Sequence, residues 1–216
     1  MYQNVAIKIC GLTRMQDVEL ALSLGADFLG FIVYSKSPRR LTLEKAVSLA
    51  DRVPAEKRVL VDVETNPDDL KEYKEAGFEY FQIHANLPLD REMLARWSDC
   101  VGRKSLWLSP RLPPHERFPE WLFEYVDTFV LDTYSKTQIG GTGHTGDFNQ
   151  FASLKQQFPD KQWILAGGLS PSNILAAIRR STANLVDVNS GIESAPGEKD
   201  PVKLRDLFQT LRPSNK

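Results

Sequence analysis

The feature that most constrains the fold of this chain is a repeated alternation of two apolar patterns. Short runs rich in Val, Ile, Leu and Phe recur along the sequence, and each is followed by a longer stretch with roughly 3.6-residue apolar spacing. This alternation is typical of βα units whose strands are parallel. The runs expected to form strands are Val5–Ile9, Phe28–Val33, Arg58–Val63, Tyr80–Ile83, Ser105–Leu108, Thr128–Leu131, Trp163–Ala166 and Leu185–Val188.

The stretches between these runs predict the helices. The fifth helix, within His115–Tyr125, is expected to be short because Pro113 and Pro114 precede it and Pro119 lies near its start. The other helices are expected at Asp17–Leu24, Leu43–Val53, Pro67–Ala76, Asp90–Trp97, Asn149–Phe158, Ser172–Arg180 and Val202–Leu211.

Eight βα units fill the chain. The sequence therefore predicts an α/β fold, a single (β/α)8 TIM-barrel domain over residues 1–216 with eight parallel strands. An open, doubly wound sheet is the alternative, but such a sheet normally carries G-x-G-x-x-G after its first strand. Here the first strand is followed by Cys10-Gly11-Leu12-Thr13, which favours the barrel.

Charge and cysteine content narrow the function classes. With 27 Lys and Arg against 28 Asp and Glu, the net charge of −1 argues against nucleic acid or an anionic membrane as a partner, and a small molecule is expected instead. The two cysteines, Cys10 and Cys100, are expected to be free thiols of a cytoplasmic protein, since no apolar run suggests export or a membrane span. The pattern carries no signal for an oligomeric state.

In a (β/α)8 barrel the residues just past each strand form the active site. Cys10 ends the first strand, where a nearby cation would make it a base, although a buried cysteine is often only a small hydrophobe. Asp132 ends the apolar run Phe129–Leu131, whose burial would raise its pKa as a general acid requires. The alternative is a strand-end aspartate that caps the following loop.

Glycines past the last two strands indicate a phosphate site. Gly167 and Gly168 follow the seventh strand, and Ser190 and Gly191 follow the eighth, where such barrels bind phosphate through backbone N–H groups. The alternative interpretation is that these glycines only make tight turns.

The remaining polar residues of this end predict no metal site. His84 shares a strand face with Gln82, and a lone histidine is more often part of the scaffold than a catalyst. The motifs H-E-x-x-H and C-x-x-C are absent. Lys8 shares the face of Cys10, so Schiff-base chemistry is a rival hypothesis, but pairing with Asp62 or Asp187 is favoured.

These residues resemble the signatures of the phosphoribosylanthranilate isomerase family, in order and over nearly the whole chain. The resemblance rests on Lys8–Thr13, Gly25–Phe31, Ser37-Pro38-Arg39, Gln82-Ile83-His84, Leu131-Asp132-Thr133, the glycine cluster 140–143, Leu165–Leu169, Val186-Asp187-Val188, Ser190–Glu193, Pro196-Gly197 and Lys199-Asp200.

The resemblance implies a (β/α)8 barrel that carries out an Amadori rearrangement of a sugar phosphate without a cofactor. It implies that Cys10 is the general base and Asp132 the general acid. It also implies that Arg39 meets the anthranilate carboxylate and that Asp187, with His84, holds other substrate groups. The loops with Gly167, Gly168, Ser190 and Gly191 would take the phosphate.

The chain also departs from the family pattern. Asp62 and Glu64 stand where the family has an aromatic residue and an asparagine, Ala85 replaces a glycine, and Asn189 replaces a serine. Gly146 replaces a phenylalanine, and the segment 135–146 is expected to act as a lid. Two alternatives therefore stay open: a related barrel epimerase or aldolase acting on another sugar phosphate, and a sensor that binds a phosphate ligand without turnover.

Overall fold

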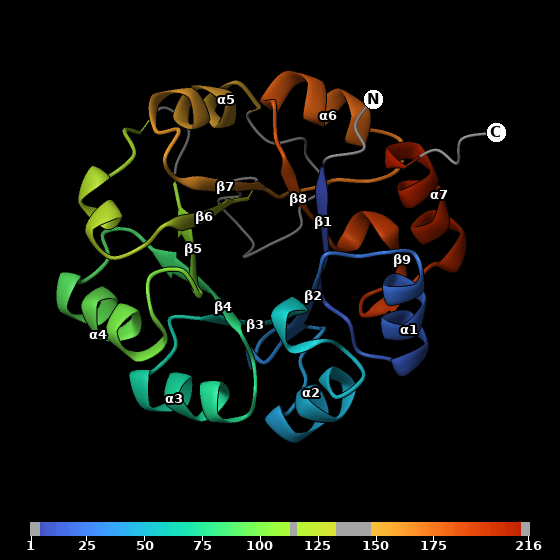
Figure 1. Ribbon diagram of the computed structural model, residues 1–216, viewed down its shortest axis with the longest axis horizontal. Coiled ribbons are helices and arrows are strands. Elements are labelled where there is room, and N and C mark those ends of the chain that lie inside the picture. The colour runs from blue at the N-terminus through green and yellow to red at the C-terminus, as the bar shows by residue number, and fades with distance from the viewer. Residues whose placement is uncertain (1–4, 113–115, 133–147, 213–216) are drawn as a thin grey trace.

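The computed structural model describes residues 5–112, 116–132 and 148–212, and its strands close into a barrel. Each strand pairs in parallel with its neighbours in chain order, and the eighth strand pairs with the first, so the predicted (β/α)8 fold is confirmed. Figure 1 looks down the barrel and shows the helices as an outer ring around the strands. The barrel strands are β1 (Ala6–Ile9), β2 (Phe28–Ile32), β3 (Arg58–Val63), β4 (Tyr80–Asn86), β5 (Leu106–Arg111), β6 (Thr128–Leu131), β7 (Gln162–Leu165) and β8 (Leu185–Val188).

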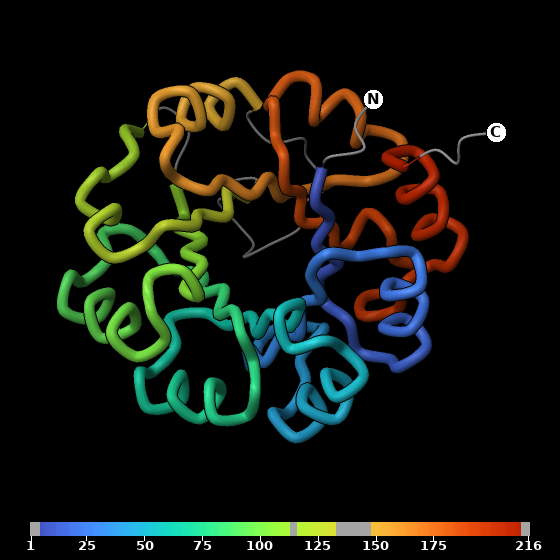
Figure 2. Tube along the Cα trace, in the orientation of Figure 1, coloured from blue at the N-terminus to red at the C-terminus, as the bar shows by residue number. Residues whose placement is uncertain are grey.

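The helices follow the strands around the ring, and the last of them, α7, lies beside α1 and closes the outer layer (Figure 2). Their bounds are α1 (Met15–Ser23), α2 (Leu43–Ala50), α3 (Pro67–Glu75), α4 (Arg91–Val101), α5 (Phe148–Gln157), α6 (Ile174–Ser181) and α7 (Pro201–Leu211), with 3-10 turns η1 (Ala55–Lys57), η2 (Glu120–Glu124) and η3 (Ser190–Ile192). Among the described residues, no helix has the length and apolarity needed to cross a membrane.

Several element bounds differ from those that the sequence predicts. β4 and β5 are longer than expected because their ladder continues through the pair Ala85 and Pro110 to Asn86 and Arg111. In the fifth unit the predicted short helix is the 3-10 turn η2; His115 lies outside the described residues. α6 begins at Ile174, later than predicted.

The hairpin formed by β9 (Glu193–Ala195) and β10 (Glu198–Lys199) was not predicted. It follows β8 and η3 and places Glu193 opposite Lys199 in its register. The side chain of Arg14 donates to the Lys199 carbonyl, and the Asp17 carboxylate accepts from the Lys199 amide, so the hairpin is docked on α1.

The strands separate an inner from an outer apolar layer because successive side chains point to opposite faces. Inside the barrel, the rings of Phe28, Tyr80 and Trp107 lie 4.8–5.4 Å apart between centroids and fill its lower part. Above them Val59, Val61 and Ile164 and their neighbours form the floor of the upper half. The base of the barrel is therefore packed, and a cavity opens at the carboxyl ends of the strands.

An aromatic cluster covers the outer face of β6 and β7, beside the unit that has only a 3-10 turn. Phe129 is fully buried, and its ring lies 5.1 Å from Phe118, 5.5 Å from Phe123 and 5.2 Å from Trp163. Four large rings fill the volume beside a turn of five residues, where the other units place a longer helix.

Replacing Phe129 with alanine is therefore expected to lower the free energy of unfolding by roughly 3–5 kcal/mol, since it removes a fully buried ring that packs against the other three. Urea unfolding followed by tryptophan fluorescence measures the change. Phe129→Leu is the matched control and is expected to cost clearly less. A loss below about 1 kcal/mol for Phe129→Ala would show that the cluster does not support the fold.

Candidate active site

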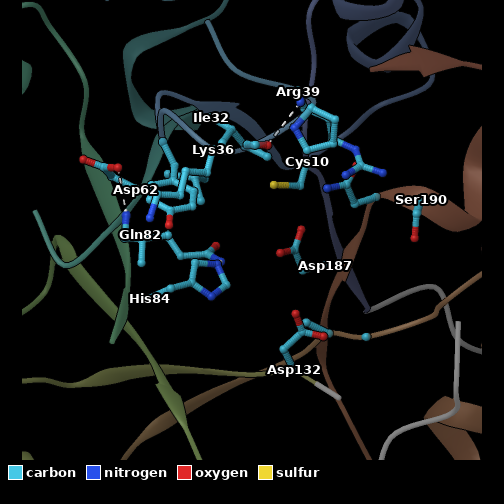
Figure 3. A pocket seen from close by; sticks show the side chains of 18 of the residues that line it. Cys10, Ile32, Lys36, Arg39, Asp62, Gln82, His84, Asp132, Asp187 and Ser190 are labelled. Atoms are coloured by element: carbon cyan, nitrogen blue, oxygen red, sulfur yellow. Dashed lines mark hydrogen bonds between the residues drawn. The ribbon is translucent and has the colours of Figure 1, made fainter. Parts of the chain in front are cut away.

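A cavity of about 590 Å³ opens at the carboxyl ends of the strands. It brings together eight of the nine residues that the sequence predicts for the site, and Figure 3 shows several of them pointing into it. These eight are Cys10, Arg39, His84, Asp132, Gly167, Gly168, Asp187 and Ser190. Gly191 does not line the cavity; its Cα packs against the Leu169 carbonyl, leaving no room for a side chain.

Cys10 follows β1 directly and faces the inside of the barrel, where it is 4% exposed. Gly30 on the neighbouring strand makes this position possible: a Cβ there would lie 2.9 Å from the Cys10 sulfur and 3.2 Å from Cε of Lys8. Burial raises the pKa of the Cys10 thiol above its ordinary value, although the nearby Lys8 ammonium acts in the opposite direction. The thiol form is therefore favoured in the empty site.

Lys8 and Asp187 form a buried ion pair on paired strands. Lys8 Nζ lies 2.9 Å from Asp187 Oδ2, and the Lys8 side chain has no solvent exposure. Burial alone would lower the pKa of Lys8, but the Asp187 carboxylate outweighs it and raises that pKa. Lys8 is thus a fixed cation beside Cys10, and of the two partners proposed from the sequence it takes Asp187.

Asp132 follows β6 on the opposite side of the cavity. Its strand continues the inner-face alternation through Val130, so the carboxyl group points inward, as Figure 3 shows. In that view the Asp187 carboxylate lies between Asp132 and Cys10. One carboxyl group and one thiol thus face a shared space from two walls, which suits acid and base work on one small ligand.

The Gln82 and His84 side chains on β4 bond to each other. The Gln82 amide nitrogen lies 3.0 Å from His84 Nε2, which places the amide as donor and leaves the His84 proton on Nδ1. Burial and the Lys8 charge lower the pKa of His84 to about 4. His84 is therefore neutral near pH 7.

Two buried carbonyl-type oxygens have no hydrogen-bond partner among the described residues, namely Gln82 Oε1 and Asp187 Oδ1. Both residues line the cavity. Because a buried acceptor without a donor is costly, these oxygens mark places where a ligand hydroxyl or amine would bind.

Arg39 lies at the rim, and its guanidinium is already paired inside the protein. Its Nε and Nη2 donate to the two oxygens of Glu193 at 2.9 and 2.6 Å. The sequence predicted a ligand carboxylate for this fork and did not anticipate Glu193.

The loop after β7 is shaped by a turn that the Asn173 side chain holds. Gly167 and Gly168 have φ values of 94° and 61°, and the Asn173 amide donates to the Gly168 carbonyl at 2.8 Å while its oxygen accepts from the Ser170 amide. η3 starts at Ser190 on the adjoining loop. The two loops meet at one side of the cavity and present backbone rather than bulky side chains, as an anion site requires.

The two carboxylates that depart from the family pattern, Asp62 and Glu64, both accept hydrogen bonds from nearby groups of the protein. Asp62 accepts from the Val63 amide, Thr65 and Tyr73 at 2.8–3.3 Å, and Figure 3 shows its carboxylate turned away from Cys10. Glu64 accepts from the Asn86 side chain at 2.8 Å. Neither carboxylate points at the centre of the cavity.

Of the other three departures, Gly146 lies outside the described residues, and Ala85 and Asn189 occupy different places. Ala85 is buried in the outer layer and does not line the cavity. Asn189 lines it, and its side-chain oxygen accepts from Lys199 at 2.8 Å.

Sequence reasoning missed the cavity residues Tyr34 and Lys36, which lie in the loop after β2. Their loop has no periodicity that would have marked them. The glycine cluster 140–143 and the segment 135–146, predicted as a lid, lie outside the described residues, as does Thr133. Within the described part of the chain, no group of three or more His, Cys, Asp or Glu residues is placed to hold a metal ion.

Comparison with known proteins gives one family. The family model described as N-(5'phosphoribosyl)anthranilate (PRA) isomerase matches residues 7–210. The N-(5'-phosphoribosyl)anthranilate isomerase of Syntrophus aciditrophicus is 37% identical over 210 residues, which is 95% of this chain and 86% of that protein. The protein of the same name from Pelobacter propionicus is 34% identical over 96% of both chains.

Solved structures agree with the sequence match. The phosphoribosyl anthranilate isomerase of Thermotoga maritima superimposes with a TM-score of 0.79 at 28% identity, over 96% of this chain and 98% of its own. A phosphoribosyl anthranilate isomerase in complex with reduced 1-(o-carboxyphenylamino)-1-deoxyribulose 5-phosphate gives a TM-score of 0.78 at 26% identity, with coverage of 96% and 98%.

The raised pKa of Cys10 predicts how the free protein reacts with a thiol reagent. In a Cys100→Ser background, the rate of iodoacetamide alkylation is expected to keep rising above pH 8.5, an ordinary thiol pKa being about 8.5, since only the thiolate attacks. Mass spectrometry of the Cys10 peptide measures the rate. A rate that levels off at or below pH 8 would contradict the proposed environment.

The lowered pKa of His84 predicts an NMR titration. The ring resonance of His84, identified by its loss in His84→Gln, is expected to move with a midpoint near 4 rather than the ordinary 6.5. Because this pKa is lowered by folding, His84 makes the folded state less stable relative to the unfolded state as the pH falls from 6.5 toward 4. A midpoint above 6 would rule out the neutral, buried ring.

Proposed function

This chain belongs to the N-(5'-phosphoribosyl)anthranilate isomerase family, and from that premise we propose which of its residues carry the reaction. The enzyme converts N-(5-phosphoribosyl)anthranilate to 1-(2-carboxyphenylamino)-1-deoxyribulose 5-phosphate in tryptophan biosynthesis. Asp132 is the general acid and Cys10 the general base of this Amadori rearrangement. The observation that carries the assignment is that a carboxyl group and a thiol face one cavity beside a fixed cation.

The first step opens the sugar ring. The Asp132 carboxyl group gives its proton to the furanose ring oxygen as the bond from that oxygen to C1′ breaks. The nitrogen lone pair forms a double bond to C1′, which leaves a cationic iminium. Proton donation of this kind contributes typically 10²–10⁴-fold to a rate.

The second step moves a proton from C2′. The thiolate of Cys10 removes this proton. The electron pair of the C2′–H bond becomes the C1′–C2′ double bond, and the second pair of the iminium C=N bond returns to nitrogen, which becomes neutral. The resulting enolamine tautomerises to the ketone. Asp132 gives up one proton and Cys10 takes up one, while the bonding electron pairs move only within the substrate, so no redox partner is needed.

Lys8 assists the base by its charge. Its ammonium sits beside Cys10 and favours the thiolate, although the Asp187 carboxylate that it pairs with acts in the opposite direction. Its raised pKa keeps it protonated, which argues against the aldolase alternative, in which a lysine must lose its proton to attack a carbonyl. Lys8 is thus an electrostatic partner of the thiolate.

Binding is divided among the other residues of the site. Asp187, through its open oxygen Oδ1, takes a donor from the substrate amine or a hydroxyl, and His84 contacts the sugar as a neutral ring. Arg39 takes the anthranilate carboxylate. The loops with Gly167, Gly168, Ser190 and Gly191 hold the phosphate, for which backbone N–H donors are suited.

Cys10→Ser and Asp132→Asn are each expected to reduce kcat by at least about 100-fold, because each removes one proton transfer. Affinity for the reduced product analogue is expected to change less than about fivefold, since the phosphate loops are untouched. Loss of substrate fluorescence measures turnover, and calorimetry measures binding.

Full activity in either variant would remove that residue from the mechanism. A wild-type protein that binds the reduced product analogue but shows no turnover would favour the sensor hypothesis instead.

A further inference from the structure

A buried network of three charged side chains borders the cavity at Arg39. Glu193 Oε1 accepts from Arg39 Nε, from Lys199 Nζ at 2.9 Å and from the Gly197 amide at 3.1 Å, while Oε2 accepts from Arg39 Nη2. The Glu193 and Lys199 side chains are 5% and 0% exposed. All of these contacts lie next to the site already described, but the mechanism uses only Arg39.

Glu193 occupies one edge of the Arg39 guanidinium and leaves the donors of another edge for a ligand. A guanidinium has five N–H donors, and Glu193 uses one on Nε and one on Nη2. The outer edge, formed by Nη1 and the second hydrogen of Nη2, retains a parallel pair of donors. A carboxylate can bind such an edge through both of its oxygens.

The charges of the network favour an anion at that edge. Two basic side chains, Arg39 and Lys199, share the single carboxylate of Glu193, and burial lowers the pKa of Lys199, so Arg39 is the lasting cation of the network. The Arg39 and Lys199 donors outweigh the effect of burial and hold the pKa of Glu193 below its usual range, which keeps it ionised. Lys199 Nζ also donates to the Asn189 side chain at 2.8 Å, so the available cationic edge belongs to Arg39.

The stem of the Arg39 side chain packs closely against the backbone at Gly11. Gly11, with φ 69°, directly follows Cys10, and a Cβ on it would fall 2.7 Å from Cδ of Arg39 and 2.6 Å from Oδ1 of Asn189. The stem of Arg39 therefore rests on the residue next to the proposed base.

We propose that Glu193 is a positioning residue for substrate recognition: supported by Lys199, it orients Arg39 so that the outer guanidinium edge meets the aromatic carboxylate of the substrate. This inference rests on the proposed role of Arg39. It assigns to the β9–β10 hairpin a part in substrate selection, because Glu193 and Lys199 face each other across that hairpin.

The test compares two ligands that differ only in the carboxylate. One is reduced 1-(o-carboxyphenylamino)-1-deoxyribulose 5-phosphate, and the other is its counterpart made from aniline. Wild type is expected to bind the carboxylated ligand at least about tenfold more tightly, as a bidentate charged pair would give. In Glu193→Gln, whose amide turns a donor toward Arg39, this preference is expected to shrink to less than about threefold.

Steady-state kinetics give a second readout. In Glu193→Gln, KM for N-(5-phosphoribosyl)anthranilate is expected to rise about tenfold while kcat changes less than threefold, since Arg39 binds a part of the substrate that does not react. Glu193→Asp keeps the charge and is expected to restore part of the ligand preference. Arg39→Lys is the matched control and is expected to lose the same preference, with no further loss in the double variant.

Each outcome separates this inference from the proposed function. Equal weakening of both ligands in Glu193→Gln and Glu193→Asp would show that Glu193 only holds the fold and would overturn the proposal, as would a wild type that ignores the carboxylate. Wild-type turnover and its loss in Cys10→Ser test the proposed function independently. If Glu193→Gln does not fold, Glu193→Asp is compared with wild type, and its preference for the carboxylated ligand is expected to lie between those of wild type and Arg39→Lys.

Discussion

The interaction on which the site depends is the ion pair between Lys8 and Asp187 inside the barrel. It joins β1 to β8, the first and last strands of the ring, at residues that lie opposite each other in the register. Burying two charges is costly, and apolar residues of the same size often stabilise a fold as well or better. The pair is therefore better explained by the site than by stability: it sets a positive charge beside Cys10, contributes to keeping His84 neutral, and leaves one oxygen of Asp187 open to a ligand.

A second buried carboxylate paired with basic side chains lies at the rim of the cavity. Glu193 lies between Arg39 and Lys199, and the lasting cation of this network, Arg39, lines the cavity. The inner pair lies beside Cys10, the proposed base, whereas the outer network includes Arg39, which is proposed only to recognise the substrate. Under this proposal the rim could change with the ligand while Cys10 and Asp132 stay the same, which is how barrels of this kind vary their function through loops.

The sequence predicted those features that depend on local pattern. The bounds of β3, β6 and β8 agree with the structure because each is a compact apolar run, and Cys10, Asp132 and Asp187 reach one cavity because parallel strands all end at the same face. The pairing of Arg39 with Glu193 joins residues 154 positions apart and leaves no periodic signal. The hydrogen bonds that turn the Asp62 carboxylate toward Thr65 and Tyr73, away from Cys10, likewise depend on side-chain geometry that the alternation of apolar and polar residues cannot show. Sequence reasoning thus found which groups gather at the site and named Asp187 as one of two candidate partners of Lys8, but it did not find the pairing of Arg39 with Glu193.

The raised pKa of Cys10 bears on the order of the two proposed proton transfers. A neutral thiol is a poor base, and here burial and the Asp187 carboxylate disfavour the thiolate more than the Lys8 and Lys199 ammonium groups favour it. In the proposed mechanism, proton donation by Asp132 opens the ring and leaves the substrate as an iminium cation in the same cavity. That cation adds to Lys8 against the Asp187 carboxylate, and in a medium of low dielectric it stabilises a thiolate more than it would in water. The proposed order is therefore ring opening first and thiolate formation second, with the thiol proton passing to the carboxylate that Asp132 becomes when it gives up its own proton.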